Sequence, residues 1–378
     1  MTTAHPGILW YVLGFVLVIG PLIFVHELGH YLVGRACGVK ADVFSIGFGR
    51  ELFGWTDKRG TRWKVSALPL GGYVKFAGDM NAAGQPSDEW LMLPAEERAR
   101  TFQAKPVWKR FLIVAAGPLT NFLVAMLMFC GFLVAFGEPR TPPVIYTVQQ
   151  GTPAEKAGIQ PGDRITEIGG QTVRHWEDIP QYVFFHPNEP VTIRGERGGR
   201  PYVTVATPRA QIERDTFGNQ SVKGFLGVGP GPVVVAPVAL IDAPAASWRI
   251  SVAIIRTTIV GIGQMIRGTR SVSDLGGPLK IAKVSGEQAS LGPLSYLWLV
   301  AVISLNLGFI NLLPIPMLDG GHLLFYAIEA VRRRPLQPQA QEWAFRTGLA
   351  ALLALMIFVT LNDLASFGLW SKLGGLIG

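Results

Sequence analysis

Eighteen consecutive residues near the start of the sequence, Ile8 to Val25, carry no charged side chain and lead directly into a His-Glu-Leu-Gly-His pentad. An apolar run of this length is typical of a helix that crosses the hydrocarbon core of a membrane, about 30 Å thick. His26 and His30 are four positions apart and project from one helix face, where a tetrahedral zinc ion can accept a nitrogen from each ring. Glu27 then lies beside the metal, where a base is needed. The pattern predicts a zinc site within a membrane helix.

A second interpretation of the pentad is a membrane helix whose histidines and glutamate are satisfied by hydrogen bonds from neighbouring helices. Ionisable groups are expensive in hydrocarbon and usually mark a functional site there. Three of them within five positions are harder to explain as incidental than one would be, which favours the metal site.

Three further uncharged stretches bring the number of expected membrane spans to four. Hydrophobic residues make up 49% of the 378 residues and charged residues 16%, which is more apolar than a typical soluble protein. The apolar residues concentrate in blocks at about 7–34, 111–137, 291–318 and 347–365. Each block is long enough to span a bilayer, the last one if Asp363 lies at the interface.

The segment from Trp248 to Arg267 is ambiguous, because it is apolar over much of its length but also contains Arg249 and Arg256. We expect an amphipathic helix that lies in the membrane interface here, in preference to a fifth span.

The distribution of basic residues predicts the orientation in the membrane. Thirteen Lys or Arg lie between Arg35 and Arg110, and the loop before the last span contains four more arginines. Loops rich in Lys and Arg stay in the cytoplasm, so the large segment from about 138 to 290 is expected on the opposite side. The net charge of +8 is then explained by topology and by contact with anionic lipid, and no motif indicates a nucleic acid partner.

A catalytic zinc ion usually has three protein ligands and one open position, so the pentad needs a partner. Asp319 is the candidate, because the first and third expected spans run in the same direction and place the pentad and Asp319 at the same depth. Pro314 and Pro316 precede it, and prolines break a helix at membrane depth only where protein or a wet cavity satisfies the freed backbone. The alternative is that Asp319 only caps a turn before Gly320.

Taken together, these residues resemble the site-2 protease family of intramembrane zinc metalloproteases, specifically its bacterial RseP-type members. The pentad is similar to the family's first-helix motif, and the segments 306–311 and 318–320 are similar to its third-helix motif. The segment 117–121 resembles the second-span motif, while 47–49 and 71–75 resemble a membrane-associated β segment. The matches cover most of the chain in the family's order.

The resemblance implies a role for each matching residue. His26, His30 and Asp319 would be zinc ligands and Glu27 the base. Substrate handling would fall to five residues, namely Asn306, Asn311, Gly71, Gly72 and Tyr73. For the two asparagines, hydrogen bonding between helices is the alternative, and a role for Asn121 is less defined.

The segment 143–208 resembles a PDZ domain, through a Gly-Thr-Pro-Ala-Glu-Lys-Ala-Gly sequence that starts at Gly151. One such unit is expected, although some RseP-type proteins contain two. The expected class is an α-helical polytopic membrane protein with about four spans, a membrane-associated β hairpin at about 43–77 and one inserted PDZ-like α+β domain. Its parts would be a first membrane half (1–142), the PDZ-like domain (143–208), a connecting region with the amphipathic helix (209–290) and a second membrane half (291–378).

The expected reaction is hydrolysis of a peptide bond in or near the membrane span of a single-span protein. Substrates already cleaved on the outer side are implied, such as anti-sigma factors of an envelope stress response, with signal-peptide remnants as further candidates. The hairpin could add a substrate strand to its free edge or only pack on the helices. The PDZ-like domain could restrict access or bind exposed C-termini.

A multi-pass location in a bacterial inner membrane follows from the resemblance and the charge pattern, with the PDZ-like domain periplasmic and the active site near the cytoplasm. Two rival functions use the same sequence features: a zinc-dependent transporter or sensor, and a proteolytically silent scaffold. Glu27 favours the protease, because neither rival requires a base beside the metal.

Overall fold

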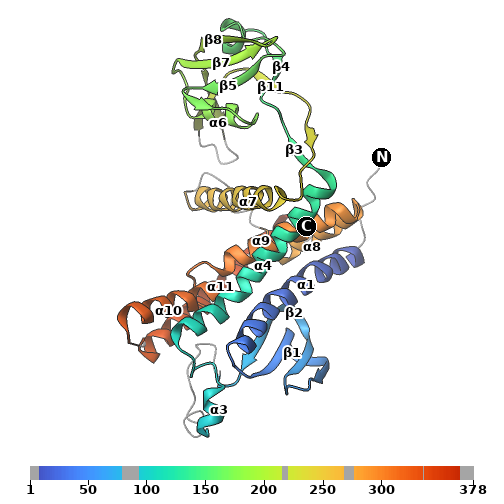
Figure 1. Cartoon of the computed structure of the whole chain (residues 1–378), viewed down its shortest axis with the longest axis vertical. Helices are drawn as coiled ribbons and strands as arrows, with labels where there is room; N and C mark the ends of the chain where they lie inside the picture. Colours follow the sequence, from blue (N-terminus) through green and yellow to red (C-terminus); the bar gives the residue numbers. More distant parts are fainter. Residues whose placement is uncertain (1–7, 79–92, 215–219, 268–275, 335, 367–378) are drawn as a thin grey trace, which may run out of the picture. The chain divides into compact units, whose positions relative to one another are not determined.

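The computed structural model describes residues 8–78, 93–214, 220–267, 276–334 and 336–366 (Figure 1). The chain divides into two compact units. Unit 1 comprises Met1–Phe129, Ser247–Ile259 and Val272–Gly378, and unit 2 comprises Cys130–Ala246 and Val260–Ser271. The candidate site lies wholly within unit 1, so each unit is described by itself.

Five helices among the described residues are long and apolar enough to cross a membrane. Four of them coincide with the expected spans: α1 (Ile8–Ala36), α4 (Val107–Phe136), α9 (Pro293–Asn311) and α11 (Pro338–Ser366). The other is α7 (Ala243–Ile266), which covers the segment expected at the interface. A multi-pass membrane protein is therefore confirmed, whereas a count of four spans is not.

The third expected span ends earlier than its uncharged run suggested. Helix α9 stops at Asn311, and α10 (Asp319–Arg332) begins after an irregular segment that contains Pro314 and Pro316. Proline has no N–H to donate and its ring clashes with the preceding helical turn, which accounts for the break. Asp319 therefore occupies the first turn of a separate helix.

Two shorter helices also lie among the described residues of unit 1. Helix α3 spans Ala95–Ala99 and α8 spans Pro278–Ser290. Asp363 on α11 is fully buried and accepts hydrogen bonds from the backbone N–H groups of Gly277 and Lys280, at the N-terminus of α8. Asp363 thus caps a neighbouring helix, and its position at the membrane interface stays a prediction.

The expected hairpin is formed by β1 (Ala41–Thr56) and β2 (Arg62–Phe76). Asp57 shapes the turn, since its carboxylate accepts hydrogen bonds from the backbone N–H groups of Arg59 and Thr61. The two long strands fold back on each other, so that residues 43–46 pair with both 72–75 and 62–65. The segment 72–76 is thereby an outer segment of the curled sheet.

Unit 1 has two hydrophobic clusters. One joins the hairpin to α1, α4 and α10, and its buried members are Tyr31, Val39, Ala41, Phe44, Phe76, Phe102, Ile113 and Tyr326. The other lies between α4 and α9 and contains Ala125, Phe129, Ala301 and Leu305. The first cluster packs the hairpin against the part of α1 that contains the pentad.

Unit 2 contains an α+β unit, which we define as residues 143–230. Its main sheet has the order β6-β5-β7-β8, with antiparallel pairing throughout. These strands are β5 (Arg164–Ile168), β6 (Gln171–Thr172), β7 (Val191–Arg197) and β8 (Arg200–Ala206). The short helices α5 (Pro153–Lys156) and α6 (Asp178–Phe184) accompany the sheet.

Three two-stranded ribbons accompany this sheet. They pair β3 (Glu138–Arg140) with β12 (Val234–Ala236), β4 (Ile145–Val148) with β11 (Val228–Pro230), and β9 (Arg209–Arg214) with β10 (Gln220–Phe225). Leu226 belongs to the buried core of the α+β unit, and Val228 packs against that core. Residues after 208, expected in a connecting region, therefore contribute to this unit.

Candidate metal centre

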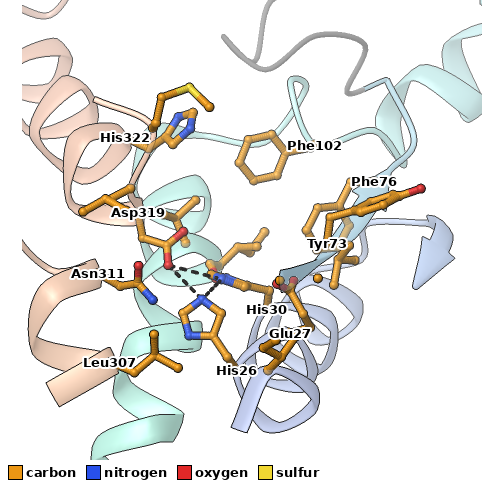
Figure 2. Close-up of a pocket in the computed structure, with 18 of the residues that line it drawn as sticks. His26, Glu27, His30, Tyr73, Phe76, Phe102, Leu307, Asn311, Asp319 and His322 are labelled. Atoms are coloured by element: carbon orange, nitrogen blue, oxygen red, sulfur yellow. Dashed lines mark hydrogen bonds and ion pairs between the residues drawn. The ribbon is translucent and has the colours of Figure 1, made fainter. Parts of the chain in front are cut away.

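The two histidines of the pentad and Asp319 bring three ligand atoms together. His26 Nε2 lies 3.2 Å from His30 Nε2 and 3.1 Å from Asp319 Oδ2, and His30 Nε2 lies 3.5 Å from the same oxygen. Figure 2 shows the three side chains pointing toward one another. The histidines come from successive turns of α1, whereas the aspartate comes from the start of α10, almost 300 residues later.

This triangle fits a zinc ion. Ligand atoms held roughly 2.0–2.1 Å from a tetrahedral zinc ion are about 3.3 Å from one another, close to all three observed separations. Two imidazoles and one carboxylate are also a donor set that zinc prefers in catalytic sites. Three protein ligands leave one position of the tetrahedron for water or substrate.

The surroundings of His30 determine which of its ring nitrogens is free for the metal. His30 Nδ1 lies 2.9 Å from the backbone carbonyl oxygen of Ile113, to which it donates its proton. Its Nε2 is then unprotonated, and the lone pair of this nitrogen faces the other two ligands. Metal-binding histidines are usually oriented by such a hydrogen bond from their second nitrogen.

Glu27 is buried beside the two ligands that flank it in sequence. Its residue is 8% exposed, and its carboxylate is hydrogen-bonded to the backbone of Val74 in β2. The carboxylates of Glu27 and Asp319 would place two negative charges in one poorly solvated site, which is unfavourable unless a cation balances them. A divalent metal ion provides that balance.

Two glycines allow the neighbouring elements to approach these side chains. A Cβ atom on Gly117 of α4 would collide with the imidazole of His30, and one on Gly72 of β2 would lie 2.9 Å from Glu27 Cγ. A larger residue at either position would push its element away from the ligands. This explains why glycine occurs at these points of the second-span and β-segment motifs.

A cavity of about 570 Å³ adjoins the three ligands and Glu27. Asn311, Gly71, Gly72 and Tyr73, all expected at a substrate site, also line it. Its other walls come from Ile23, Phe48, Val74, Phe76, Phe102, Ile113, Val114, Leu307, Met317, Leu318, His322, Tyr326 and Leu352. The cavity thus has an apolar lining with a small polar centre, as is usual for a binding site.

Asn306 is not among the residues that line the cavity. Its Oδ1 accepts a hydrogen bond of 2.9 Å from the hydroxyl of Thr258 on α7, and its Nδ2 donates to the carbonyl oxygen of Val302. These are the hydrogen bonds of an asparagine that links two helices, which was the alternative interpretation of this residue.

The sequence did not predict a role at the site for two polar residues that lie near the ligands. His322 lines the cavity one turn after Asp319. Asn121 of α4 is completely buried with its side-chain amide 3.3 Å from His26 Nδ1. The only available signal was the inclusion of Asn121 in the second-span motif, because no local spacing relates it to a histidine 95 positions away.

Comparisons with known proteins agree with this geometry. Residues 14–355 match the sequence model of peptidase family M50. A protein of Agrobacterium fabrum named as a candidate zinc metalloprotease is 44% identical over 361 residues, covering 94% of this chain and 96% of that protein. Metalloprotease MmpA of Caulobacter vibrioides is 39% identical over 398 residues, covering 98% and 99%.

A solved structure was also matched by the chain, the PDZ domain of an SdrC-like protein from Listeria monocytogenes. It is 20% identical, covers 23% of this chain and 84% of its own, and has a TM-score of 0.19.

The family match covers most of the chain, including both parts of the sequence that supply the ligand triangle. Relatives that align over nearly their whole length are named as metalloproteases, two of them as zinc metalloproteases, and the helices of this chain are those of a multi-pass membrane protein. The chain therefore belongs to peptidase family M50, the site-2 proteases, and is a zinc metalloprotease of that type.

Proposed function

We propose that this protease hydrolyses a peptide bond in or near the transmembrane segment of single-span membrane proteins. The observation that carries the proposal is the cavity of unit 1, which combines a triangle of zinc ligands, a buried glutamate and an outer β segment at the end of an apolar helix. A peptide can be bound, oriented and hydrolysed there without leaving the protein.

His26, His30 and Asp319 would hold the zinc ion. A zinc ion bound there supplies a Lewis acid that polarises the scissile carbonyl and lowers the pKa of water. Glu27 accepts the proton of the attacking water and passes it to the leaving amine, as a general base and then a general acid. This route needs no serine or cysteine nucleophile and forms no acyl-enzyme.

The outer segment 72–76 of β2 would hold the substrate as an added strand. A transmembrane helix shields its carbonyl groups by internal hydrogen bonds, so the scissile region must be extended before attack. In the described part of the chain, this segment forms strand pairs only with residues of β1, and the backbone of Val74 is also hydrogen-bonded to Glu27. Tyr73 and Gly72 line the cavity beside Glu27, so an added strand would pass the base.

A topology with four crossings is supported by the meeting of His26 with Asp319. The pentad lies near the C-terminal end of α1, and Asp319 follows the C-terminal end of α9, so both helices would run toward the same membrane face. With α4 running back, the chain between α4 and α9 must cross an even number of times. If α7 crossed the membrane, a second crossing would be needed before α9. Helix α8 has 13 residues and is about 20 Å long, which is too short for that crossing. We therefore assign α7 to the interface.

The charge pattern supports a zinc site near the cytoplasmic face of a bacterial inner membrane and an α+β unit in the periplasm. Anti-sigma factors already shortened on the outer side are the proposed substrates, with signal-peptide remnants as further candidates. In this arrangement the α+β unit excludes substrates with long external tails.

The first test is cleavage of a reporter that has one apolar span and a short external tail. Purified wild-type protein, Glu27→Gln and the matched control Glu342→Gln would be compared in detergent, with the zinc content of each measured in parallel. Glu342 is half-exposed and pairs with Arg346 on the surface of α11. We expect Glu27→Gln to retain zinc and lose roughly 10²- to 10⁴-fold in rate, the contribution of a general base. Equal rates in all three proteins would contradict the role of Glu27.

Two substrate series test the remaining parts. In one series, single backbone nitrogens of the substrate are methylated near the scissile bond. Methylation of every second nitrogen should abolish cleavage and methylation of the others should not, because an added strand uses every second N–H group. Lengthening the external tail should reduce cleavage whatever its sequence if the α+β unit acts by size. Dependence on a free C-terminus, with no dependence on length, would instead indicate recognition of C-termini.

A further inference from the structure

Asn121 is the buried polar side chain next to the ligands for which the mechanism has no role. It lies on α4, is completely buried, and its Nδ2 is placed 3.3 Å from His26 Nδ1. The amide oxygen, Oδ1, has no hydrogen-bond partner among the described residues. Among the described residues, the contact with His26 is therefore the one hydrogen bond of this amide.

The contact with His26 restricts the protonation of that ring. If Asn121 Nδ2 donates to His26 Nδ1, the single proton of the neutral imidazole must be on Nε2. Yet Nε2 is the atom that faces His30 and Asp319 at 3.2 and 3.1 Å and would have to bind the metal as an unprotonated lone pair. An amide whose Nδ2 faces His26 Nδ1 is therefore incompatible with zinc binding by His26.

Rotating the amide by 180° removes the conflict, because its oxygen and nitrogen differ little in size and are exchanged by the rotation. Oδ1 then faces His26 Nδ1 and accepts a hydrogen bond from its N–H, and Nε2 is left free for the metal. His30 already has the equivalent arrangement, with Nδ1 donating to the carbonyl oxygen of Ile113. Both ligands would then be oriented by an oxygen acceptor on α4.

The backbone of Asn121 is held in place independently of its amide. The hydroxyl of Ser304 on α9 donates a hydrogen bond of 2.9 Å to the backbone carbonyl oxygen of Asn121. This bond joins α4 to α9 and persists whatever side chain occupies position 121. The contribution of the amide can therefore be separated from the packing of the two helices.

We propose that Asn121 is a positioning residue whose carboxamide oxygen accepts a hydrogen bond from His26 Nδ1–H and thereby orients His26 for zinc. The inference rests on the ligand set given under the proposed function. Partners of this kind typically contribute ten- to hundred-fold to metal affinity. The acceptor role also makes a specific distinction: an aspartate at 121 can accept this hydrogen bond, whereas an alanine cannot.

The test is the zinc affinity of the purified full-length protein, measured by competition with a chelator in detergent. Asn121→Ala should bind zinc ten- to hundred-fold more weakly than wild type, and Asn121→Asp should bind it at least as tightly. Asn306→Ala is the matched control, because it removes a carboxamide that links α7 to α9 and does not line the cavity, and it should leave zinc affinity unchanged. The thermal midpoint of each zinc-free protein shows whether a loss of affinity merely reflects unfolding.

Either variant alone can overturn the inference. Wild-type affinity in folded Asn121→Ala would show that the amide does not orient His26, and a tenfold loss in Asn121→Asp would show that the amide acts as a donor. His26→Ala distinguishes these results from failure of the ligand set. If zinc binds equally well to His26→Ala and wild type, the proposed site itself is wrong.

Discussion

Two buried groups of charged and polar side chains, one in each unit, differ in how their hydrogen bonds are completed. In the α+β unit, Asp163 is fully buried and accepts hydrogen bonds from the backbone N–H of Gln160 and from Arg197, whose Nε lies 2.7 Å from Oδ1. In unit 1, the ligand atoms of His26, His30 and Asp319 face one another at separations of 3.1 to 3.5 Å.

The difference separates a structural group from a functional one. The carboxylate of Asp163 is satisfied by its own unit, so it stabilises the fold and requires no ligand. The side chains of the ligand triangle turn their lone pairs inward, an arrangement that is unfavourable until a positive ion joins it. A buried polar cluster left incomplete by its own fold is the stronger indicator of a binding site.

The largest expected effect is the loss of zinc affinity in the Asp319→Asn variant. The carboxamide has nearly the same shape as the carboxylate but lacks its charge, so the triangle loses an anionic ligand. We expect a loss of zinc affinity beyond the ten- to hundred-fold typical of residues that only orient a ligand. Metal analysis after dialysis against a chelator measures it. Zinc retained at the wild-type level would mean that Asp319 only caps α10.

The corresponding change in unit 2 should affect stability and leave zinc alone. Asp163→Ala removes a buried acceptor that is hydrogen-bonded to a guanidinium, and we expect the α+β unit to lose about 2–3 kcal/mol of unfolding free energy. Limited proteolysis within residues 143–230 would report the unfolding. Zinc content is the control, and its loss in this variant would contradict the separation of the two groups.

Acid should affect the same unit through Asp163. Burial by itself would raise the pKa of this carboxyl. Hydrogen bonds from Arg197 and from the backbone of Gln160 outweigh burial, so the pKa lies below its ordinary 3.8. A lowered native pKa gives stability that is present above the unfolded pKa and is lost as the pH falls through the native pKa. Denaturant midpoints of the α+β unit should therefore contain a contribution from Asp163 that is constant from pH 5 to 8 and decreases below about 4. Asp163→Asn should lack this acid-dependent contribution.

The smallest effect is expected for an ion pair of unit 1 that is only partly buried. Arg110 Nη2 on α4 lies 2.7 Å from Glu329 Oε1 on α10, with side chains 14% and 16% exposed. Glu329→Gln removes the charge but keeps a hydrogen-bond acceptor, so we expect a loss of about 1 kcal/mol in thermal stability and unchanged zinc content. A loss of zinc would mean that this pair positions Asp319 on the same helix.

Much of the site was predictable because its features are local or depend only on topology. The histidine spacing places two ring nitrogens on one face of any helix. The prolines before Asp319 account for the helix break, and the alternation of apolar and polar residues on either side of Asp57 is a local pattern typical of a hairpin. Four of the five apolar helices follow directly from the length of the uncharged runs.

The remaining features depend on which helices touch. Asn306 and Asn311 belong to one motif, yet Asn311 lines the cavity and Asn306 bonds to α7, because five residues along a helix change the direction of a side chain. Leu226 joined the core of the α+β unit from beyond its expected end through the pairing of β4 with β11. Neither outcome has a local signal.

The sequence by itself determined four of the apolar helices, the shared helix face of His26 and His30, and Asp319 as the candidate third ligand, since each follows from the length of a run, from periodicity or from the direction of a span. Only the tertiary structure decided that Asn121 faces His26, that Ile113 supplies an acceptor to His30, and that the outer edge of β2 borders the cavity. The two histidine contacts join residues of α1 and α4 that are 83 and 95 positions apart, and they depend on how closely the two helices approach. The glycine at 117 permits that approach, and spacing along one helix cannot reveal the partner it brings near.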